Sequence, residues 1–257
     1  MTGKKFEKLI EIMSRLRGPD GCPWDREQTH CSLTTFLLEE TYEVIESIES
    51  GGSDELKEEL GDLLLQIVFH SQIAKEEKSF TIEDVIDTIN KKLIRRHPHV
   101  FGIADIKSSE EQRVHWERIK KKEKGSSVLD GVPKTLPSLQ RAYRVQQKAS
   151  AVGFDWKDFK PAVNKVKEEF EEFEKALEED DRDKISEELG DILFSIVNVS
   201  RFIRIDPEAA LRKAVDKFID RFKIIEKILE DKGKDLKDVS LEEMDKIWNQ
   251  IKKERFN

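Results

Sequence analysis

Pairs of acidic residues recur at one spacing in the two halves of the chain. Each half carries two acids three positions apart and, 16 positions further on, a second such pair. The eight residues are Glu40, Glu43, Glu59 and Asp62 in the first half and Glu169, Glu172, Glu188 and Asp191 in the second. Carboxylates three apart project from one face of a helix, so two such helices packed antiparallel would hold four around one site. Such a site suits a hard divalent cation, and that cation suggests phosphate chemistry.

The residues around the second acidic pair distinguish it from an ordinary solvated helix face. On a helix, Glu59 and Asp62 form a narrow polar stripe with Gln66, and apolar residues flank that stripe on both sides. The second half repeats this pattern. Burying an unpaired charge is costly, so these acids need partners, either a metal ion or an interior network of Lys and Arg. Because the chain has 54 acidic residues, one such pair means little, and the duplication is what favours the metal.

Basic and aromatic residues in both halves are candidates for binding the rest of a phosphorylated substrate. Clustered Lys and Arg side chains would neutralise phosphate oxygens, and Trp would stack on a nucleobase. The candidates are Lys92, Arg95, Arg96, Lys217, Arg221, Trp24 and Trp156. Taken singly, such cations more often lie on a solvated face, and a Trp is at least as often part of a core or an interface.

The bulk composition narrows the class of protein. The 257 residues carry a formal net charge of −8, which argues against direct binding to nucleic acid because that needs a basic face. Two cysteines, Cys22 and Cys31, are too few for a disulfide framework. The N-terminus shows no export signal, and no segment approaches the length of a membrane span. We therefore expect a cytoplasmic protein that does not bind membranes.

Helical periodicity dominates the chain, and no region shows the sustained alternation of a strand. We therefore expect an all-α protein. The expected helices cover 5–17, 33–50, 54–77, 81–96, 108–123, 138–150, 160–179, 182–204, 207–231 and 240–254. A charged segment that becomes rich in Gly, Ser and Pro joins the halves. The predicted organisation is a helical domain at 1–120, a linker at 121–136 and a second helical domain at 137–257.

Several motifs resemble the MazG-type nucleoside triphosphate pyrophosphohydrolases, which belong to the all-α NTP pyrophosphatase group. In the first half they are GPDGCPWDREQTH (18–30), LLEETYEV (37–44), EELGDLLLQIVFH (58–70), RRHPHVFG (95–102) and VHWERIKKKEK (114–124). In the second half they are GFDW (153–156), EELGDILFSIVN (187–198) and DKFIDRF (216–222). The resemblance covers essentially the whole chain. Its tandem form is the pattern of the long members of the family.

The resemblance implies two tandem MazG-like helical-bundle domains that form a homodimer. It implies hydrolysis of (d)NTP to (d)NMP and pyrophosphate with Mg²⁺, for which Mn²⁺ is a possible substitute. The family's metal-binding pattern falls on the eight acids given above. One position departs from it, because the family often carries Asp where the first half has Lys91, whereas the second half has Asp216. We therefore expect the second repeat to contribute at least as much turnover as the first.

Two functions from different classes remain open at this stage. The first is a nucleotide pyrophosphohydrolase, in which Lys and Arg side chains steady the leaving pyrophosphate and which serves house-cleaning or control of the nucleotide pool. The second is a nucleotide-binding regulatory or scaffold protein, a helical dimer with one or both acidic sites inactive. Four retained carboxylates in each half favour the enzyme. The sequence leaves open the base, the sugar, the phosphorus attacked and the Glu that acts as base.

Overall fold

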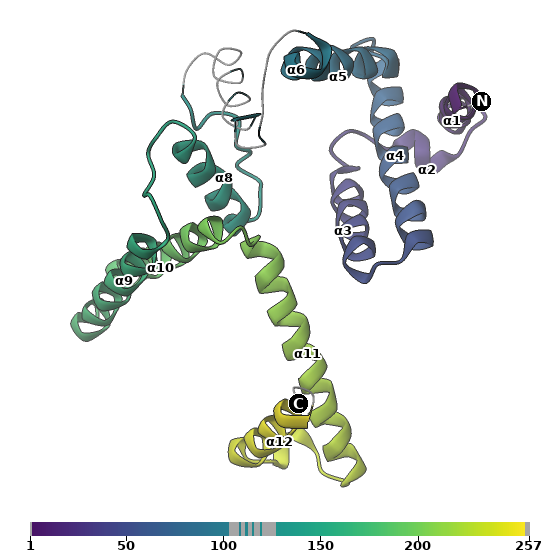
Figure 1. Cartoon of the computed structure of the whole chain (residues 1–257). Coiled ribbons are helices and arrows are strands. Elements are labelled where there is room, and N and C mark those ends of the chain that lie inside the picture. Colours follow the sequence, from purple (N-terminus) through teal and green to yellow (C-terminus); the bar gives the residue numbers. More distant parts are fainter. Residues whose placement is uncertain are drawn as a thin grey trace. The chain divides into compact units, whose positions relative to one another are not determined.

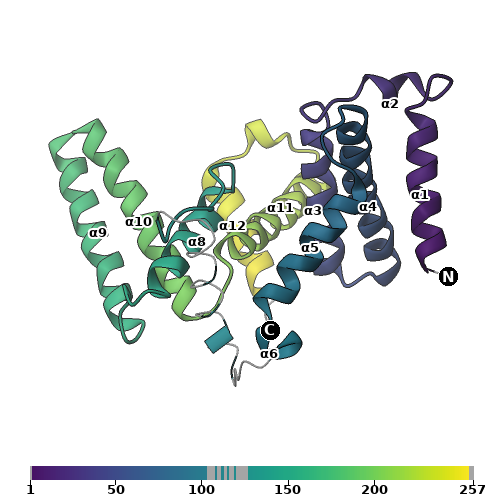
Figure 2. The same ribbon diagram turned by 90° about the horizontal axis from the view of Figure 1, so that it is seen from above.

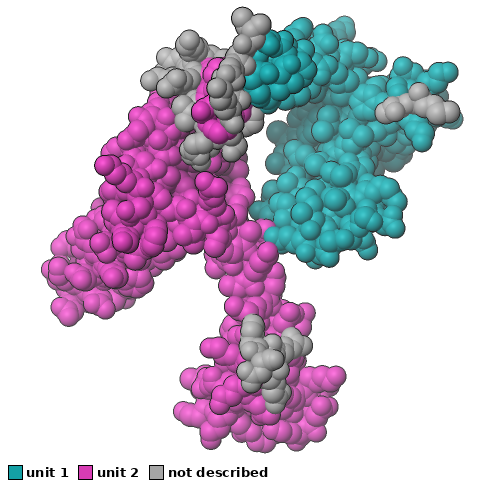
Figure 3. All heavy atoms as spheres, viewed as in Figure 1, with its two compact units in different colours: residues 1–105 teal, residues 106–257 magenta. Residues whose placement is uncertain are grey.

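The computed structural model describes residues 2–102 and 127–254, together with 108, 111, 112, 115 and 119. The described residues are helical or lie in turns and loops, and no strand occurs among them. This confirms the expected all-α class. The chain divides into two compact units, Met1–Asp105 (unit 1) and Ile106–Asn257 (unit 2), which Figure 3 colours separately. The expected helix at 108–123 and the first part of the expected linker lie largely outside the described residues.

Unit 1 is built around a pair of helices joined by a tight turn. Its helices are α1 (Thr2–Leu16), α2 (Pro23–Glu27), α3 (Thr34–Ser50), α4 (Ser53–Glu76), α5 (Ile82–Arg96) and α6 (Pro98–Phe101). Helix α3 ends at Ser50 and is capped by Gly51, whose φ of 78° is left-handed and whose N–H donates to the carbonyl of Ser47. Glycine takes this conformation without steric cost, so the chain reverses at once into α4. Helices α3 and α4 therefore lie side by side (Figure 1).

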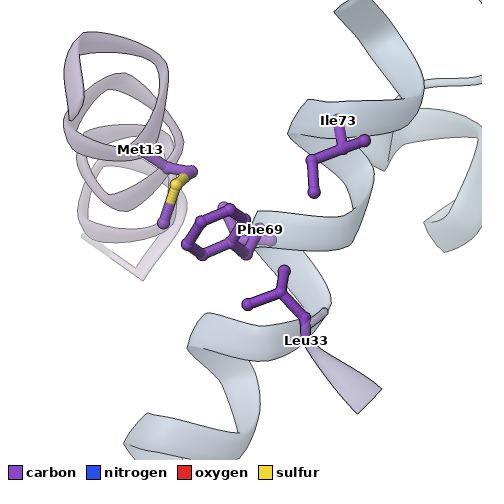
Figure 4. Packing of buried hydrophobic residues seen from close by; sticks show 5 residues of the cluster. Met13, Leu33, Phe69 and Ile73 are labelled. Carbon is purple, nitrogen blue, oxygen red and sulfur yellow. The ribbon is translucent and has the colours of Figure 1, made fainter. Parts of the chain in front are cut away.

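The core of unit 1 lies on one side of α4. It consists of Met13 from α1, Leu33 just before α3, and Val68, Phe69 and Ile73 from α4, each at most 3 % exposed. Figure 4 shows Met13 of α1 facing Phe69 across this core. Full burial of one such side chain contributes about 1.5–3 kcal/mol. The core fixes the orientation of α4 and hence the direction in which its acidic stripe points.

Arg17 ties three segments of unit 1 together. Its guanidinium donates to the carboxylate of Glu76 at the end of α4, with a shortest distance of 2.8 Å. It also donates to the backbone carbonyls of Asp25 and Gln28, at the end of α2. The same group lies over the ring of Phe69, 5.4 Å from its centroid. Because the Arg17 side chain is only 7 % exposed, this charge depends on those partners.

Substituting Arg17→Met should destabilise unit 1 by about 2–3 kcal/mol. The change leaves two backbone carbonyls without their donor and removes a largely buried ion pair. The contribution of the ion pair to this loss is reduced because Glu76 is partly exposed to solvent. Urea unfolding followed by circular dichroism measures the loss. The matched control is Lys8→Met on the same helix, where the ion pair with Glu11 is exposed, and it should change stability by less than about 0.5 kcal/mol. Equal effects of the two substitutions would contradict this role of Arg17.

The same pair predicts a pH dependence. Burial alone would raise the pKa of Glu76, but hydrogen bonds from Arg17 and Gln72 outweigh it and hold that pKa below its ordinary value. A carboxyl group whose pKa is lower in the folded state stabilises the fold fully at pH values above its pKa in the unfolded state, about 4.3. That stabilisation is lost as the pH falls through the pKa of the folded state. The stability difference between the parent and Arg17→Met should therefore be constant near neutral pH and shrink in acid below about pH 4.

Unit 2 repeats the helical pair and adds a second pair. Its helices are α8 (Ser138–Ser150), α9 (Lys160–Glu179), α10 (Arg182–Phe202), α11 (Pro207–Asp231), the short η1 (Leu236–Asp238) and α12 (Leu241–Glu254). Helices α9 and α10 form a hairpin that both ribbon views show (Figures 1 and 2). Its turn uses Asp180 in the left-handed region, with φ of 53°, and Asp181, which caps α10. Thus the two repeats reverse the chain with different residues at equivalent positions.

The other contacts of unit 2 join α8 to α10 and to α11, and α11 to α12. Helix α8 packs on α10, where the side-chain amide of Gln146 donates to the carbonyl of Phe194 at 2.8 Å. The helices α11 and α12 share a separate apolar cluster. Its buried residues are Ile225, Leu229, Val239, Ile247 and Ile251. Asp206 caps α11 by accepting from the N–H of Ala209, with proline at the first position of the helix.

The long helices in the described residues agree closely with those expected from the sequence, whereas the short α2, α6 and η1 were not expected. The largest difference at a boundary is at α1, which begins at Thr2 rather than at 5. The apolar flanks of α4, however, have different environments. One flank forms the core with α1, whereas Leu60, Leu64 and Ile67 on the other remain 38–49 % exposed. No helix in the described part of the chain is both long and apolar enough to cross a membrane.

Candidate metal centres and an adjacent cavity

The first carboxylate cluster forms where α3 and α4 lie side by side. Glu40 and Glu43 come from α3 and Glu59 from α4, and one carboxylate oxygen from each lies within 4.8 Å of the others. Asp62, the fourth predicted ligand, lies outside this group of three but near enough to raise the pKa of Glu40 and of Glu59. The tight turn at Gly51 brings the two acidic pairs to the same level of the helical pair.

Burial and mutual repulsion raise the pKa values of carboxyl groups in the first cluster. Desolvation is the largest cause that raises the pKa of Glu40, followed by the charges of Asp62, Glu43 and Glu59, and a hydrogen bond from Gln66 only partly offsets them. Desolvation also leads the causes that raise the pKa of Glu59, with Glu43 next. A divalent cation would relieve this repulsion, because it favours the charged form of each carboxylate.

The second cluster repeats the first on α9 and α10. Glu169 and Glu172 come from α9 and Glu188 from α10, again with oxygens within 4.8 Å of one another. Desolvation raises the pKa of Glu188, as do the charges of Glu172, Glu169 and Asp191. Glu169 is only 5 % exposed, so its charge needs a partner. Three carboxylates from two helices, with a fourth nearby, form an oxygen-only donor set that fits Mg²⁺ or Mn²⁺.

Lys165 is a site residue that the sequence reasoning missed. Its ammonium nitrogen lies 2.8 Å from Glu169 and 2.7 Å from Glu168. Hydrogen bonds from this ammonium to Glu168 and Glu169 raise the pKa of Lys165, so the side chain stays charged at neutral pH. The signal was available, since a Lys four residues before an acidic ligand lies on the same helix face.

A cavity of about 820 Å³ opens beside the second cluster. Glu169, Asp191 and Lys165 line it at the acidic end. Going along α10, Asn198 lies seven residues beyond Asp191, roughly 10 Å at the rise of a helix. The remaining lining is largely apolar and includes Trp156, one of the predicted substrate-binding residues. If a cation is held by the carboxylates at one end, the aromatic and amide groups further along suit a ligand with a phosphorylated end and a flat ring.

A polar cluster holds the loop that carries Trp156 against α10. The guanidinium of Arg201 makes two hydrogen bonds to Asp155, at 2.8 and 2.5 Å. It also donates to the side-chain oxygen of Asn198 at 3.0 and 3.1 Å, and it lies 4.5 Å from the ring centroid of Phe202. Asp155 precedes Trp156 directly, so this bidentate pair fixes the wall of the cavity that the Trp forms.

The predicted phosphate-binding cations lie on other helices than the carboxylates of their units. Lys92 and the two arginines after it lie on α5, which begins beyond the C-terminal end of α4, whereas Glu59 and Asp62 lie in the N-terminal half of α4. Lys217 and Arg221 lie on α11, and neither lines the cavity beside the second cluster. The Arg221 side chain is buried, with its guanidinium 5.4 Å from the ring centroid of Trp248 on α12.

Trp24, the other predicted base-stacking residue, lies in α2 and is about half exposed. Its ring meets that of Phe36 edge to face, with centroids 5.6 Å apart. Phe36 begins the face of α3 that continues with Glu40 one turn later. The two repeats therefore share their carboxylates but differ in the residue one turn before them, which is Phe36 in the first and Lys165 in the second.

The fold and these two clusters together define a class of protein: an all-helical tandem repeat with a cluster of three carboxylates in each repeat. Comparison with known families agrees with this. The MazG nucleotide pyrophosphohydrolase domain matches the chain twice, at residues 28–101 and 158–225. The chain belongs to the MazG family.

Individual relatives match nearly the full length of this chain. The chain is 51 % identical over 254 residues to the nucleoside triphosphate pyrophosphohydrolase/pyrophosphatase MazG of Thermotoga maritima, covering 98 % of this chain and 97 % of that protein. It is 42 % identical over 260 residues to the nucleoside triphosphate pyrophosphohydrolase of Escherichia coli K12, covering 98 % and 99 %. It is also 47 % identical to the uncharacterized protein YabN of Bacillus subtilis, covering 96 % of this chain and 52 % of that protein.

Proposed function

We propose that this protein hydrolyses nucleoside triphosphates to the monophosphate and pyrophosphate with the help of Mg²⁺. The observation that carries the proposal is the second carboxylate cluster, which borders a cavity with an aromatic wall. The names of the Thermotoga maritima and Escherichia coli relatives support the reaction. The oxygen-only donor set supports the choice of a hard cation over Zn²⁺, which prefers nitrogen and sulfur ligands.

The carboxylates would hold the cation and shape the reaction. Glu169, Glu172, Glu188 and Asp191 are the proposed ligands in the second repeat, and Glu40, Glu43, Glu59 and Asp62 in the first. Bound Mg²⁺ would neutralise phosphate oxygens and make a coordinated water a better nucleophile. One Glu of each set would orient the water for attack in line with the leaving pyrophosphate. Lys217 and Arg221 of α11, with Lys92, Arg95 and Arg96 of α5, remain proposed phosphate ligands.

The nucleoside would lie in the cavity beside Trp156. Gln146 supports this, because it is 8 % exposed and lines the cavity. Its amide nitrogen is committed to the carbonyl of Phe194, so the side-chain oxygen is an acceptor fixed in direction. That buried oxygen has no hydrogen-bond partner among the described residues. A buried acceptor without a donor is costly, so a nucleoside that enters the cavity and displaces the side chains covering this oxygen would gain by supplying the missing donor.

Gln146→Met should raise KM for nucleotides about tenfold while changing kcat little. The substitution removes an acceptor distant from the reacting phosphates, and a lost hydrogen bond of this kind costs about 1–1.5 kcal/mol. Steady-state kinetics on ATP at saturating Mg²⁺ measures it. The control is Gln147→Met, because Gln147 accepts from Arg144 and does not line the cavity. If Gln146→Met and Gln147→Met gave the same KM as the parent, the nucleoside would not bind here.

We further propose that a second repeat or a second chain covers the open side of each central helix, as in a homodimer. Leu60, Leu64 and Ile67 on α4 have exposed counterparts on α10. These are Leu189, Leu193 and Ile196, each 45–48 % exposed. Apolar stripes of this length on two helices favour burial in an interface. Light scattering should give twice the mass of one chain, and Leu193→Glu should shift the protein toward monomer, whereas a monomeric parent would contradict the homodimer.

A further inference from the structure

Asn198 presents a hydrogen-bond donor of fixed direction to the cavity beside the second cluster. Its side-chain oxygen accepts two hydrogen bonds from the guanidinium of Arg201, at 3.0 and 3.1 Å. A guanidinium only donates, so the oxygen of the Asn198 amide must face Arg201 and the nitrogen must point away from it. Asn198 lines the cavity, and among the described residues that nitrogen has no hydrogen-bond partner. Its N–H groups are therefore open to a ligand.

The orientation of Asn198 is fixed because Arg201 is itself held in place. The Arg201 side chain is only 8 % exposed, and it makes two hydrogen bonds to Asp155. Its guanidinium also lies 4.5 Å from the ring centroid of Phe202. Turning the Asn198 amide over would set its nitrogen against the guanidinium, donor against donor, in a largely buried place. Arg201 thus keeps the nitrogen of Asn198 directed at the cavity.

A fixed acceptor lies close to this donor. The amide nitrogen of Gln146 donates to the carbonyl of Phe194, which lies one helical turn before Asn198 on α10. The oxygen of Gln146 is therefore near Asn198, and both residues line the cavity. That oxygen is buried without a partner among the described residues, and a ligand reaches it by displacing the side chains that cover it. The cavity wall thus combines one donor and one acceptor, each held by a second group of the protein.

The nucleobases fall into two groups by the edge that lies farthest from the sugar. Uracil, thymine, guanine and hypoxanthine carry a carbonyl beside a ring N–H there, whereas cytosine and adenine carry an amino group beside an unprotonated ring nitrogen. With the phosphates at the carboxylates, this far edge is the part of a nucleotide that reaches Asn198, about two helical turns beyond Asp191. A carbonyl there accepts from Asn198, and the ring N–H donates to Gln146. An amino group would instead set donor against donor at Asn198 and acceptor against acceptor at Gln146.

We propose that Asn198 is a specificity-determining residue of the second repeat, which favours nucleoside triphosphates whose base carries a carbonyl beside a ring N–H. This inference rests on the proposed function and names the class of base that the cavity prefers. Arg201 is the positioning residue, because it acts on the substrate only through the direction that it gives to Asn198.

The first repeat has no such donor. The position 129 residues before Asn198 is Phe69, which is 3 % exposed in the core of unit 1. An apolar ring in that core has no group that could read the edge of a base. Substitutions at Asn198 therefore report on the second repeat alone.

The test compares UTP with CTP, which differ only in this edge of the base. It uses the full chain with Glu59→Gln, which removes a proposed ligand of the first cluster so that the second dominates. In this background, steady-state kinetics at saturating Mg²⁺ should give a kcat/KM for UTP about tenfold above that for CTP. Asn198→Asp keeps the acceptor for Arg201 but replaces the donating nitrogen with an accepting oxygen. It should therefore reverse the preference, so that CTP becomes the better substrate.

Two further measurements support the comparison. Asn164→Asp makes the same change of charge at an exposed position of α9 outside the cavity, and it should keep the UTP-to-CTP ratio of the background. Zebularine triphosphate carries hydrogen in place of the carbonyl of UTP and has no ring N–H. Without any substitution at Asn198, its kcat/KM should be about tenfold below that of UTP, which tests the inference even if Asn198→Asp fails to fold.

The outcomes separate a base-reading residue from a structural one. If Asn198 only supported the fold, Asn198→Asp would lower kcat/KM for UTP and CTP alike and leave their ratio unchanged, and the inference would be wrong. Equal kcat/KM for UTP, CTP and zebularine triphosphate, or hydrolysis by the parent that Glu59→Gln abolishes, would also overturn it while leaving the proposed function intact. Absence of hydrolysis of every nucleoside triphosphate by the parent would refute the proposed function and the inference with it.

Discussion

Glu188→Gln and Glu59→Gln together should abolish hydrolysis of nucleoside triphosphates, with a loss on the order of a thousandfold in kcat. Each substitution keeps the size of the side chain and removes one carboxylate from a cluster whose members lie within 4.8 Å of one another. The loss of a ligand displaces the cation that stabilises charge in the transition state. Steady-state rates for the parent, both single variants and the double variant at saturating Mg²⁺ test this.

The residues directly before Glu59 and Glu188 provide matched controls for the loss of activity. Glu58→Gln and Glu187→Gln change exposed carboxylates one residue away, and they should retain the parent rate within about twofold. We expect Glu188→Gln to cost at least as much turnover as Glu59→Gln. The second repeat has an acid, Asp216, where the first has Lys91, and a cation, Lys165, where the first has Phe36. A double variant that hydrolyses at the parent rate would show that the two clusters are not the catalytic sites.

Removal of divalent metal should abolish activity and lower the melting temperature at neutral pH. The pKa values of Glu40, Glu59 and Glu188 are raised, first by desolvation and then by neighbouring carboxylates. A raised carboxyl pKa means that these groups destabilise the metal-free fold as pH rises through the folded value. Bound Mg²⁺ relieves that repulsion and adds RT ln(1 + [Mg²⁺]/Kd), about 2.7 kcal/mol at a hundredfold excess over Kd.

The stabilisation by metal should therefore depend on pH in a defined direction. Protons compete with the cation for the same oxygens, so the shift in melting temperature on adding Mg²⁺ should be largest near neutrality. It should shrink as pH falls into the range where the raised carboxyl groups protonate. Scanning calorimetry with EDTA and with Mg²⁺ at several pH values measures this. The double variant Glu59→Gln with Glu188→Gln should lose most of the shift, and an equal shift in parent and double variant would mean that the metal binds elsewhere.

Much of the fold could be predicted from local signals in the sequence. Gly51 with Gly52, and Asp206 with Pro207, mark helix ends through backbone preferences that need no tertiary contact. The acidic pairs could be placed on facing helices because side-chain direction follows from helix geometry. Three of the four predicted acids in each half do come together. The duplication of the acidic pairs at a constant offset supported a functional site more strongly than any single pair could.

The rest depended on contacts between segments distant in sequence. The bond from Gln146 to Phe194 joins residues 48 positions apart, and that from Arg201 to Asp155 joins residues 46 apart. No periodicity predicts such pairs, so Trp156 was a candidate, but the Arg201–Asp155 pair that holds its loop and the fixed acceptor of Gln146 were missed. Lys165 was missed for another reason, since its signal is an ordinary helical charge pair in a chain where charged residues make up 39 %. Only the structure, which places Lys165 beside the buried Glu169, distinguishes it from the other charged residues.

The most direct test of the proposed reaction is phosphorus NMR of ATP incubated with the parent protein and Mg²⁺. We predict that the signals of ATP are replaced by those of AMP and pyrophosphate, with no ADP formed, and that EDTA or the double variant Glu59→Gln with Glu188→Gln stops the conversion. Formation of ADP and inorganic phosphate, or no turnover of any nucleoside triphosphate with Mg²⁺ or Mn²⁺, would contradict the assignment of this chain as a nucleoside triphosphate pyrophosphohydrolase.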